Sequence, residues 1–213
     1  MFLNWKRNSK NKVFVIGRNK TGTTSIGRAL AEMGYKMGSQ SKAELLMGSW
    51  LQREFKEIVN YCKTAEAFQD APFSHDYTFQ VMDYAFPGSK FILTVRNNGE
   101  EWYESLIRFH TKIVGKERLP TPDDLKAFMY REKGWIWRNQ QAIYGIDEQS
   151  LYDKDIYIQH YEMHNMRVKD YFRYRQDDLL VLNLADPDSM NDLCDFLGKP
   201  LPSTGMPHLN TSR

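Results

Sequence analysis

The sequence is poor in cysteine and contains no long apolar run. Its 213 residues include two cysteines, Cys62 and Cys194, which are too few for a disulfide framework or a cysteine-based metal site. We expect both to be buried and unreactive. No run of about 18 apolar residues occurs, so we expect no membrane span. The first residues, MFLNWKRNSKNK, lack the apolar stretch of a secretory signal, and we therefore expect a cytoplasmic protein.

An excess of charge of one sign is also missing. The 29 lysines and arginines nearly balance the 27 aspartates and glutamates, which leaves a net charge of +2. This charge is too small to indicate a nucleic-acid-binding protein, although a local basic pocket for an anion is compatible with it. The length and the hydrophobic fraction of 41% are typical of one soluble domain, which we expect to span residues 1–213. The composition does not indicate an oligomeric state.

Four short apolar segments have the composition of buried strands, and helical patterns separate them. They are VFVI (13–16), AEAFQD (65–70), KFILTV (90–95) and DLLVLNL (178–184). This alternation predicts an α/β fold of three layers, with a mainly parallel central sheet of about five strands. A helical insert over about residues 106–176 precedes the last strand, and we expect it to cover the carboxyl edge of the sheet.

Two of the predicted helices have clear start signals. Ile26 and Leu30 follow at helical spacing after Thr24, and Gly34 is a typical helix end. Ser41 and Glu44 form a capping-box pattern, which predicts one helix from there to Cys62.

The segment GRNKTGTTS (17–25) has the composition of a phosphate-binding loop between a strand and a helix. Two glycines permit a tight turn, so that backbone N–H groups converge on an anion at the start of the helix. Hydroxyl groups and two positive charges add donors. The predicted anion-binding residues are Arg18, Asn19, Lys20, Thr21, Gly22, Thr23, Thr24 and Ser25.

The loop differs from an ATP-binding loop at one position. In the pattern G-x-x-x-x-G-K-[ST], the lysine position is occupied by Thr23, and Lys20 precedes the second glycine. ATP chemistry needs that lysine and Mg²⁺ to neutralise a triphosphate. No acidic residue of the Walker-B type stands out after a strand, and KFILTV ends in Arg96 rather than aspartate. A sulfuryl group in transit carries one fewer negative charge than a phosphoryl group, so amides, hydroxyls and one lysine suffice without a metal.

A second anion site is predicted after the strand KFILTV. Arg96 follows the strand directly, and Ser105 lies within the first turns of the next predicted helix. An arginine at a strand end beside a helix start is suited to clamp a phosphate.

Together the two sites resemble the sulfotransferases that use 3′-phosphoadenosine 5′-phosphosulfate (PAPS). NKTGTTS (19–25) is similar to the family's 5′-phosphosulfate loop, although Asn19 replaces the usual proline. LTVRNNGEEWYES (93–105) is similar to the arginine and serine that hold the 3′-phosphate, with one additional residue between them. Further segments extend the likeness, to a bacterial-type branch, over about residues 12 to 210. The resemblance implies a P-loop-like fold, PAPS as co-substrate, the bisphosphate PAP as product, and no metal.

The resemblance also implies catalytic residues. Lys20 would contact the bridging oxygen as negative charge develops on it. The family carries a basic histidine two residues before a proline, and Asp70 stands in that place here, two residues before Pro72. A carboxylate serves as base if burial raises its pKa. His75 is the alternative base, because it lies about as far before Arg96 as the family's histidine lies before its arginine. A third possibility is that neither residue is the base.

The acceptor side is less defined. His164 and Asn165 resemble a recurring pair of this branch, which acts either in the acceptor site or as a buried structural pair. The predicted reaction is sulfuryl transfer from PAPS to a hydroxyl or amine of a small molecule or glycan. The alternatives are a small-molecule kinase with an atypical P-loop and a non-catalytic nucleotide-binding relative.

Overall fold

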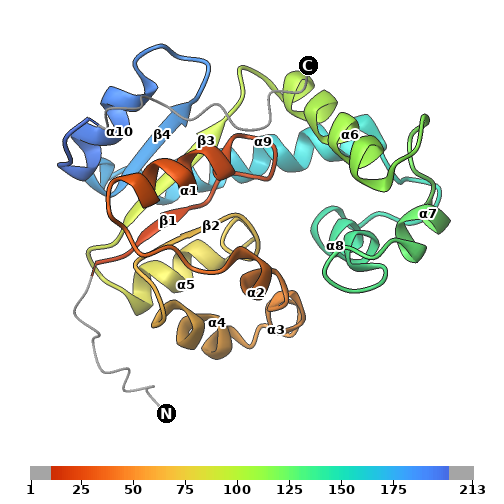
Figure 1. Cartoon of the computed structure of the whole chain (residues 1–213), viewed down its shortest axis with the longest axis horizontal. Coiled ribbons are helices and arrows are strands. Elements are labelled where there is room, and N and C mark those ends of the chain that lie inside the picture. Colours follow the sequence, from red (N-terminus) through yellow and green to blue (C-terminus); the bar gives the residue numbers. More distant parts are fainter. Residues whose placement is uncertain (1–10, 202–213) are drawn as a thin grey trace.

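The centre of the molecule is an all-parallel sheet of four strands in the order β2-β1-β3-β4 (Figure 1). A computed structural model describes residues 11–201. The strands are β1 (Val13–Val15), β2 (Ala67–Gln69), β3 (Lys90–Val95) and β4 (Leu179–Asn183). The described residues thus form four strands where about five are predicted. Because all strands run the same way, the residues that follow them meet at one carboxyl edge.

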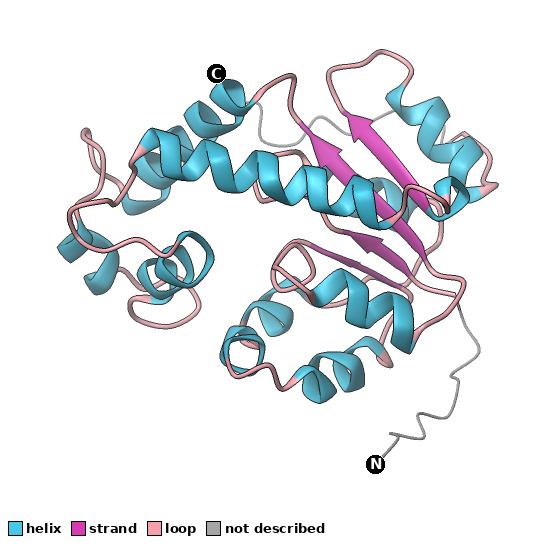
Figure 2. Cartoon of the chain, turned by 180° about the vertical axis from the view of Figure 1, so that it is seen from behind, coloured by secondary structure: helices cyan, strands magenta, loops and turns pink. Residues whose placement is uncertain are grey.

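Helices cover both faces of the sheet, which confirms the predicted three layers (Figure 2). The helices are α1 (Thr23–Glu32), α2 (Gln40–Glu44), α3 (Met47–Leu51), α4 (Phe55–Cys62), α5 (Thr78–Ala85), α6 (Gly99–Val114), α7 (Pro122–Ala127), α8 (Trp135–Tyr144), α9 (Lys154–Tyr171) and α10 (Ser189–Leu197), with a 3₁₀ turn η1 (Gln176–Asp178) before β4.

The side chains of β1 point alternately to the two faces of the sheet, and the core accordingly consists of two clusters. Successive strand residues point to opposite faces. Val13 and Val15 pack with residues of α1 and α10 on one face. Phe14 and Ile16 pack with residues of α4, α5 and α9 on the other. In the second cluster the ring of Phe14 stacks between those of its strand neighbours Phe68 and Phe91.

The single helix predicted from Ser41 to Cys62 is wrong, because the segment forms α2, α3 and α4. Arg53, between α3 and α4, has a left-handed backbone with φ 61°, which no helix interior accommodates. The expected capping box does not form either. Glu44 is buried and accepts hydrogen bonds from Gln40 and Arg131, so a tertiary contact replaces the local one.

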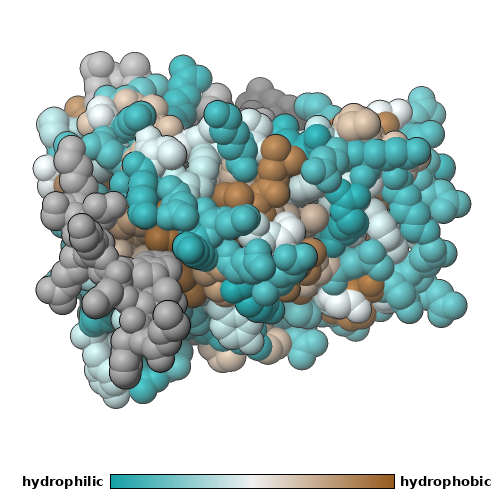
Figure 3. Space-filling model, turned by 90° about the horizontal axis from the view of Figure 1, so that it is seen from below, coloured by the Kyte–Doolittle hydropathy of each residue, from teal (hydrophilic) through white to brown (hydrophobic). Residues whose placement is uncertain are grey.

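The helical insert lies at the carboxyl side of the sheet, with α6 and α9 packed together and α7 and α8 beyond them (Figure 1). Within residues 11–201, no helix has the length and apolar character that crossing a membrane requires. Both cysteines are buried and unpaired, as expected. Seen from below, the surface is mostly hydrophilic, and hydrophobic side chains gather near the middle of that face (Figure 3).

Candidate functional site

The loop between β1 and α1 occupies the carboxyl edge of the sheet, between β2 and β3. At Gly17 a Cβ atom would lie 2.0 Å from Thr94 Oγ1 and 2.5 Å from the Thr94 carbonyl oxygen, so a side chain is excluded there. Lys20 and Gly22 have left-handed backbones, with φ of 68° and 99°. No side chain caps α1 at Gly22. The first N–H groups of this helix have no intrahelical acceptor, and they are suited to bind an anion.

Some hydroxyl groups of the loop hold its conformation, and others lie at the cavity. Thr21 is buried and donates to the Arg18 carbonyl at 2.5 Å, while its oxygen lies 2.6 Å from Thr94 Oγ1. Thr21 therefore fixes the loop against β3. Thr23 Oγ1 donates to Asp70 Oδ2 at 3.4 Å, and Thr24 is exposed at the start of α1. Ser25 is buried beneath it.

The two cations of the loop differ in their surroundings. The guanidinium of Arg18 is buried, donates to the Ser74 carbonyl at 2.9 Å and pairs with Asp76 at 3.0 Å. Asp76 also pairs with Arg167 at 3.2 Å, so Arg18 shares its counter-charge with a second arginine. Lys20 Nζ lies 4.1 Å from the centre of the Phe109 ring and is partly exposed. Burial lowers the pKa of Lys20, and the neighbouring arginines act in the same direction while Asp70 opposes them.

Lys20 and Asp70 line the same cavity, which encloses about 370 Å³, within the size range of small-molecule sites. Asp70 follows β2 directly and has a left-handed backbone with φ 56°. Its Oδ1 accepts from the Ala71 N–H at 2.9 Å. Burial, and next the negative charge of Glu44, raise the pKa of Asp70 to about 6, although the Ala71 N–H and Thr23 hydroxyl favour the charged form.

His75 lines the same cavity but is almost completely enclosed, with 1% of its surface exposed. Its ring lies 4.5 Å from that of Trp50. Burial, assisted by Arg18, lowers the pKa of His75 to about 3, so the imidazole is neutral at neutral pH. A base of such low pKa accepts a proton less readily than Asp70 does.

Seven further polar residues line the cavity, and the sequence did not predict them as site residues. They come from α2, α6, the turn before α8, and α8 itself, and they are Gln40, Glu44, His110, Tyr130, Arg131, Asn139 and Gln140. No motif marks these positions, and the capping-box pattern gave Glu44 a local role. The remaining signal is the run of polar residues beside apolar ones in the part of the predicted helical insert that forms α8.

His110 is the most constrained of these residues. Its Nδ1 lies 2.9 Å from the hydroxyl of Tyr152, which fixes the orientation of the ring. Burial, with the nearby charge of Lys20, lowers the pKa of His110 to about 3. A neutral, oriented imidazole thus lies beside Phe109, whose ring contacts Lys20.

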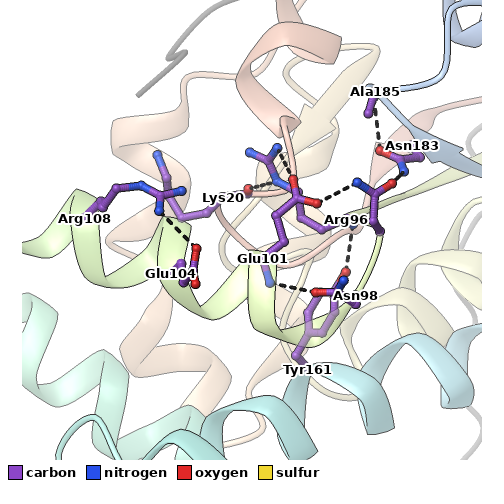
Figure 4. A network of polar contacts seen from close by, with 10 residues as sticks. Lys20, Arg96, Asn98, Glu101, Glu104, Arg108, Tyr161, Asn183 and Ala185 are labelled. Carbon is purple, nitrogen blue, oxygen red and sulfur yellow. Dashed lines mark hydrogen bonds and ion pairs between the residues drawn. The ribbon is translucent and has the colours of Figure 1, made fainter. Parts of the chain in front are cut away.

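Arg96 contacts Lys20, Glu101 and Tyr161 (Figure 4). It also lines a second cavity. Its Nε donates to the Lys20 carbonyl at 2.9 Å, and its Nη1 pairs with Glu101 at 3.2 Å. The backbone N–H of Arg96 donates to the hydroxyl of Tyr161 at 2.9 Å. The second cavity encloses about 560 Å³ and includes Arg96, Tyr161 and Asn165 among its lining residues.

Six predicted residues do not line the cavity of Lys20 and Asp70, and they are Thr21, Ser25, Arg96, Ser105, His164 and Asn165. Ser105 is 3% exposed and lines neither cavity. His164 is buried, and its Nε2 donates to the Ile16 carbonyl at 2.8 Å, which anchors α9 to the end of β1. Burial lowers the pKa of His164 well below its usual value, so the ring is neutral. Asn165 faces the cavity of Arg96 instead.

No group of three or more His, Cys, Asp or Glu side chains is arranged to hold a metal ion in the part of the chain that the structure describes. Chemistry without a metal stays a prediction.

Comparison with known proteins identifies the family. Residues 12–213 match the family described as a sulfotransferase domain. A comparison with individually curated proteins gives no match. The family match covers nearly the whole chain, including the loop, Asp70 and Arg96. The chain therefore belongs to the sulfotransferase domain family.

Proposed function

We propose that this protein transfers the sulfuryl group of PAPS to a hydroxyl or amine group of a small molecule or glycan. The observation that carries the proposal is the cavity in which an uncapped helix start, Lys20 and Asp70 face one another. An anion-binding loop and a carboxylate of raised pKa in one enclosed cavity match the needs of a donor and a base. A cytoplasmic location, and a single domain over residues 1–213, stay predictions.

The loop would hold the phosphosulfate of the donor. The N–H groups at the start of α1 and the hydroxyl of Thr24 supply donors without a metal, since the hydroxyl of Thr23 donates to Asp70. Lys20 would stabilise the bridging oxygen, on which charge develops as the bond to sulfur breaks. Phe109 and the neighbouring cations lie around its ammonium group, and this favours donation to an anionic oxygen.

In the proposed transfer step one bond from sulfur to oxygen forms and another breaks. An acceptor oxygen attacks sulfur and forms the new S–O bond, while the bond from sulfur to the bridging oxygen breaks. The electron pair of that bond leaves with the bisphosphate PAP, and the acceptor proton passes to Asp70. The raised pKa of Asp70 supports this assignment over His75, which is enclosed by Trp50 and has a pKa near 3.

The 3′-phosphate would bind beside Arg96. Its guanidinium is partly exposed, with 31% of the side chain accessible, and it borders the second cavity. Ser105 is buried away from that cavity, so the support for Arg96 is stronger than the support for Ser105. Glu101 competes for the guanidinium, and the phosphate would displace or share this contact.

A transfer assay tests the proposal. The wild-type protein, incubated with ³⁵S-labelled PAPS and a panel of acceptors, is expected to yield a labelled product in the presence of EDTA. Lys20→Ala is expected to lower kcat by about 100-fold or more, as loss of a single charge-stabilising donor does in other enzymes. Lys56→Ala, an exposed lysine on α4, is the matched control and should leave the rate unchanged. Equal rates for wild type and Lys20→Ala would contradict the role of the loop.

A further inference from the structure

We infer that the acceptor is an uncharged compound with several hydroxyl groups, of the sugar or cyclitol class, held by the buried carboxamides of Asn139 and Gln140. The inference rests on the proposed function, and it narrows the acceptor to one chemical class.

The main observation is a pair of buried polar atoms without partners. Asn139 and Gln140 are 6% and 1% exposed, and both line the cavity of Lys20 and Asp70. Within residues 11–201, no hydrogen-bond partner lies near Asn139 Oδ1 or Gln140 Oε1. Buried polar atoms in native proteins almost always have a partner. Two adjacent unpaired acceptors on the wall of a cavity therefore point to a ligand that donates more than one hydrogen bond.

Other residues that line the cavity are polar as well. Glu44 accepts from Gln40 and from Arg131, and the Tyr130 hydroxyl lies 3.5 Å from an Arg131 nitrogen. These groups present both donors and acceptors, and a hydroxyl group matches either kind. Trp135 and Ile136 supply apolar surface beside them, which suits the C–H face of a ring. An acceptor with a single hydroxyl would leave the carboxamide oxygens unpaired, at a cost in affinity.

The charges of the cavity select against an anionic acceptor. The guanidinium of Arg18 is held by the Ser74 carbonyl and by Asp76, which also pairs with Arg167, and Lys20 is assigned to the donor. The acceptor end then holds the carboxylates of Asp70 and Glu44 with Arg131 as the counter-charge, and Arg131 is already paired with Glu44. A carboxylate on the acceptor would meet more negative than positive charge.

Matched acceptor pairs test the inference on the wild-type protein with labelled PAPS. The first pair is myo-inositol and cyclohexanol, which share a six-carbon ring and differ in the number of hydroxyls. The second pair is D-glucose and D-glucuronate, which differ in charge. We expect higher kcat/KM for inositol than for cyclohexanol and for glucose than for glucuronate. Equal or higher kcat/KM for cyclohexanol or for 2-naphthol would overturn the inference.

Substitutions on α8 test whether Asn139 and Gln140 bind the acceptor. Asn139→Leu and Gln140→Met preserve volume and remove the carboxamide, and each is expected to raise the KM of the best polyol about tenfold. The KM of PAPS should not change. Gln141→Met, at the next and exposed position of α8, is the control. An unchanged polyol KM in both variants would assign no acceptor role to these residues.

Binding of the product separates this inference from the proposed function. Adenosine 3′,5′-bisphosphate should raise the Tm of the wild type and of both α8 variants, which also shows that the variants fold. If the bisphosphate binds and no polyol is sulfated, the acceptor class is wrong and the donor site stands. If the bisphosphate does not bind, the proposed function fails, and the inference fails with it.

Discussion

Asp70 has an environment that ordinary surface aspartates lack. It ends a buried strand, accepts a hydrogen bond from its neighbour's N–H, and lies in one cavity with Glu44 and Lys20. Burial and the Glu44 charge raise its pKa to about 6. The group is therefore ionised at neutral pH and still basic enough to accept a proton.

A pH profile of the transfer reaction follows from this value. A base must be deprotonated to act, so kcat/KM should fall as the pH drops through about 6 and should be level above it. Asp70→Asn is expected to lower kcat by roughly 100-fold to 10,000-fold, the usual contribution of a general base. Bisphosphate affinity should not change, because Asn preserves the shape of the side chain. A full rate in Asp70→Asn would exclude Asp70 as the base.

Substitution of Glu44 tests the cause of the raised pKa. Glu44→Gln removes the negative charge and leaves Arg131 without its carboxylate, and both changes favour ionised Asp70. The acidic limb of the profile should therefore move to lower pH. A limb that stays in place or moves up would show that it belongs to another group.

Individual residues of the proposed donor site are easier to predict from the sequence than those of the proposed acceptor site. Arg96 follows β3 directly and Lys20 lies in the loop after β1, so the parallel sheet brings both to one edge whatever the rest of the chain does. Glu44, Asn139 and Gln140 reach the cavity through the packing of helices, which no local pattern encodes. The same packing buries His164, whose ring donates a hydrogen bond to the Ile16 carbonyl.

Among the elements, α6 determines how Arg96 is presented. Its first turn carries Asn98 as N-cap, with the side chain accepting from the Glu101 N–H at 2.8 Å. This cap fixes the start of the helix and places Glu101 against Arg96. Asn97 also donates to Glu101, at 2.7 Å, so the carboxylate is held in the position that competes with a phosphate.

Removal of the Glu101 charge should strengthen binding of the bisphosphate. Glu101→Gln is expected to lower Kd by about fivefold, because a partly exposed ion pair contributes up to about 1 kcal/mol. Glu100→Gln, on the same turn but paired with Lys154, should change Kd by less than about twofold. Isothermal titration calorimetry at low salt measures both values. Weaker binding in Glu101→Gln would mean that Glu101 organises the site.

The elements themselves are partly predictable. The four strands appear where their apolar runs indicate, since burial on both faces leaves a clear signal. The region over 40–62 is less predictable, because the breaks between α2, α3 and α4 depend on tertiary contacts of Glu44 and on the left-handed Arg53.

For the whole molecule, the close approach of β1 and β3 at Gly17 is a requirement of the fold. Gly17→Ala would place a methyl group against the Thr94 backbone, and we expect it to lower the free energy of unfolding by about 3 kcal/mol. Bisphosphate affinity should fall too, since the loop must shift. Gly48→Ala is the control, because no atom lies within 4 Å of its added Cβ in α3. It should be neutral or stabilising by up to about 1 kcal/mol. Equal stabilities for the two variants would contradict the contact argument.

Buried histidines make the stability of the molecule dependent on pH. His75, His110 and His164 have pKa values well below the unfolded value, so the unfolded chain binds protons that the folded chain does not. Their contribution is complete above about pH 6.5 and is lost as the pH falls, with a slope of about 1.4 kcal/mol per pH unit for each group. Asp70 and Glu44, whose pKa values are raised, oppose this loss below about pH 6.

Urea denaturation at pH 7 and pH 5 measures the net effect of these histidines and carboxyl groups on the free energy of unfolding. The free energy of unfolding should be lower at pH 5, because three histidines outnumber two carboxyls. His110→Asn preserves an acceptor or donor toward Tyr152 and should reduce the slope by about 1.4 kcal/mol per pH unit. An unchanged slope would show that His110 does not contribute.

In the proposed function, the loop and Arg96 bind a 3′-phosphorylated adenine nucleotide without a metal. Calorimetric titration of the wild type with adenosine 3′,5′-bisphosphate in EDTA tests this binding, with ATP and Mg²⁺ as the comparison. We predict saturable binding of the bisphosphate, a loss of about tenfold or more in Arg96→Ala, and weaker binding of ATP with Mg²⁺. Binding of ATP with Mg²⁺ and none of the bisphosphate would contradict the claim and indicate a kinase instead.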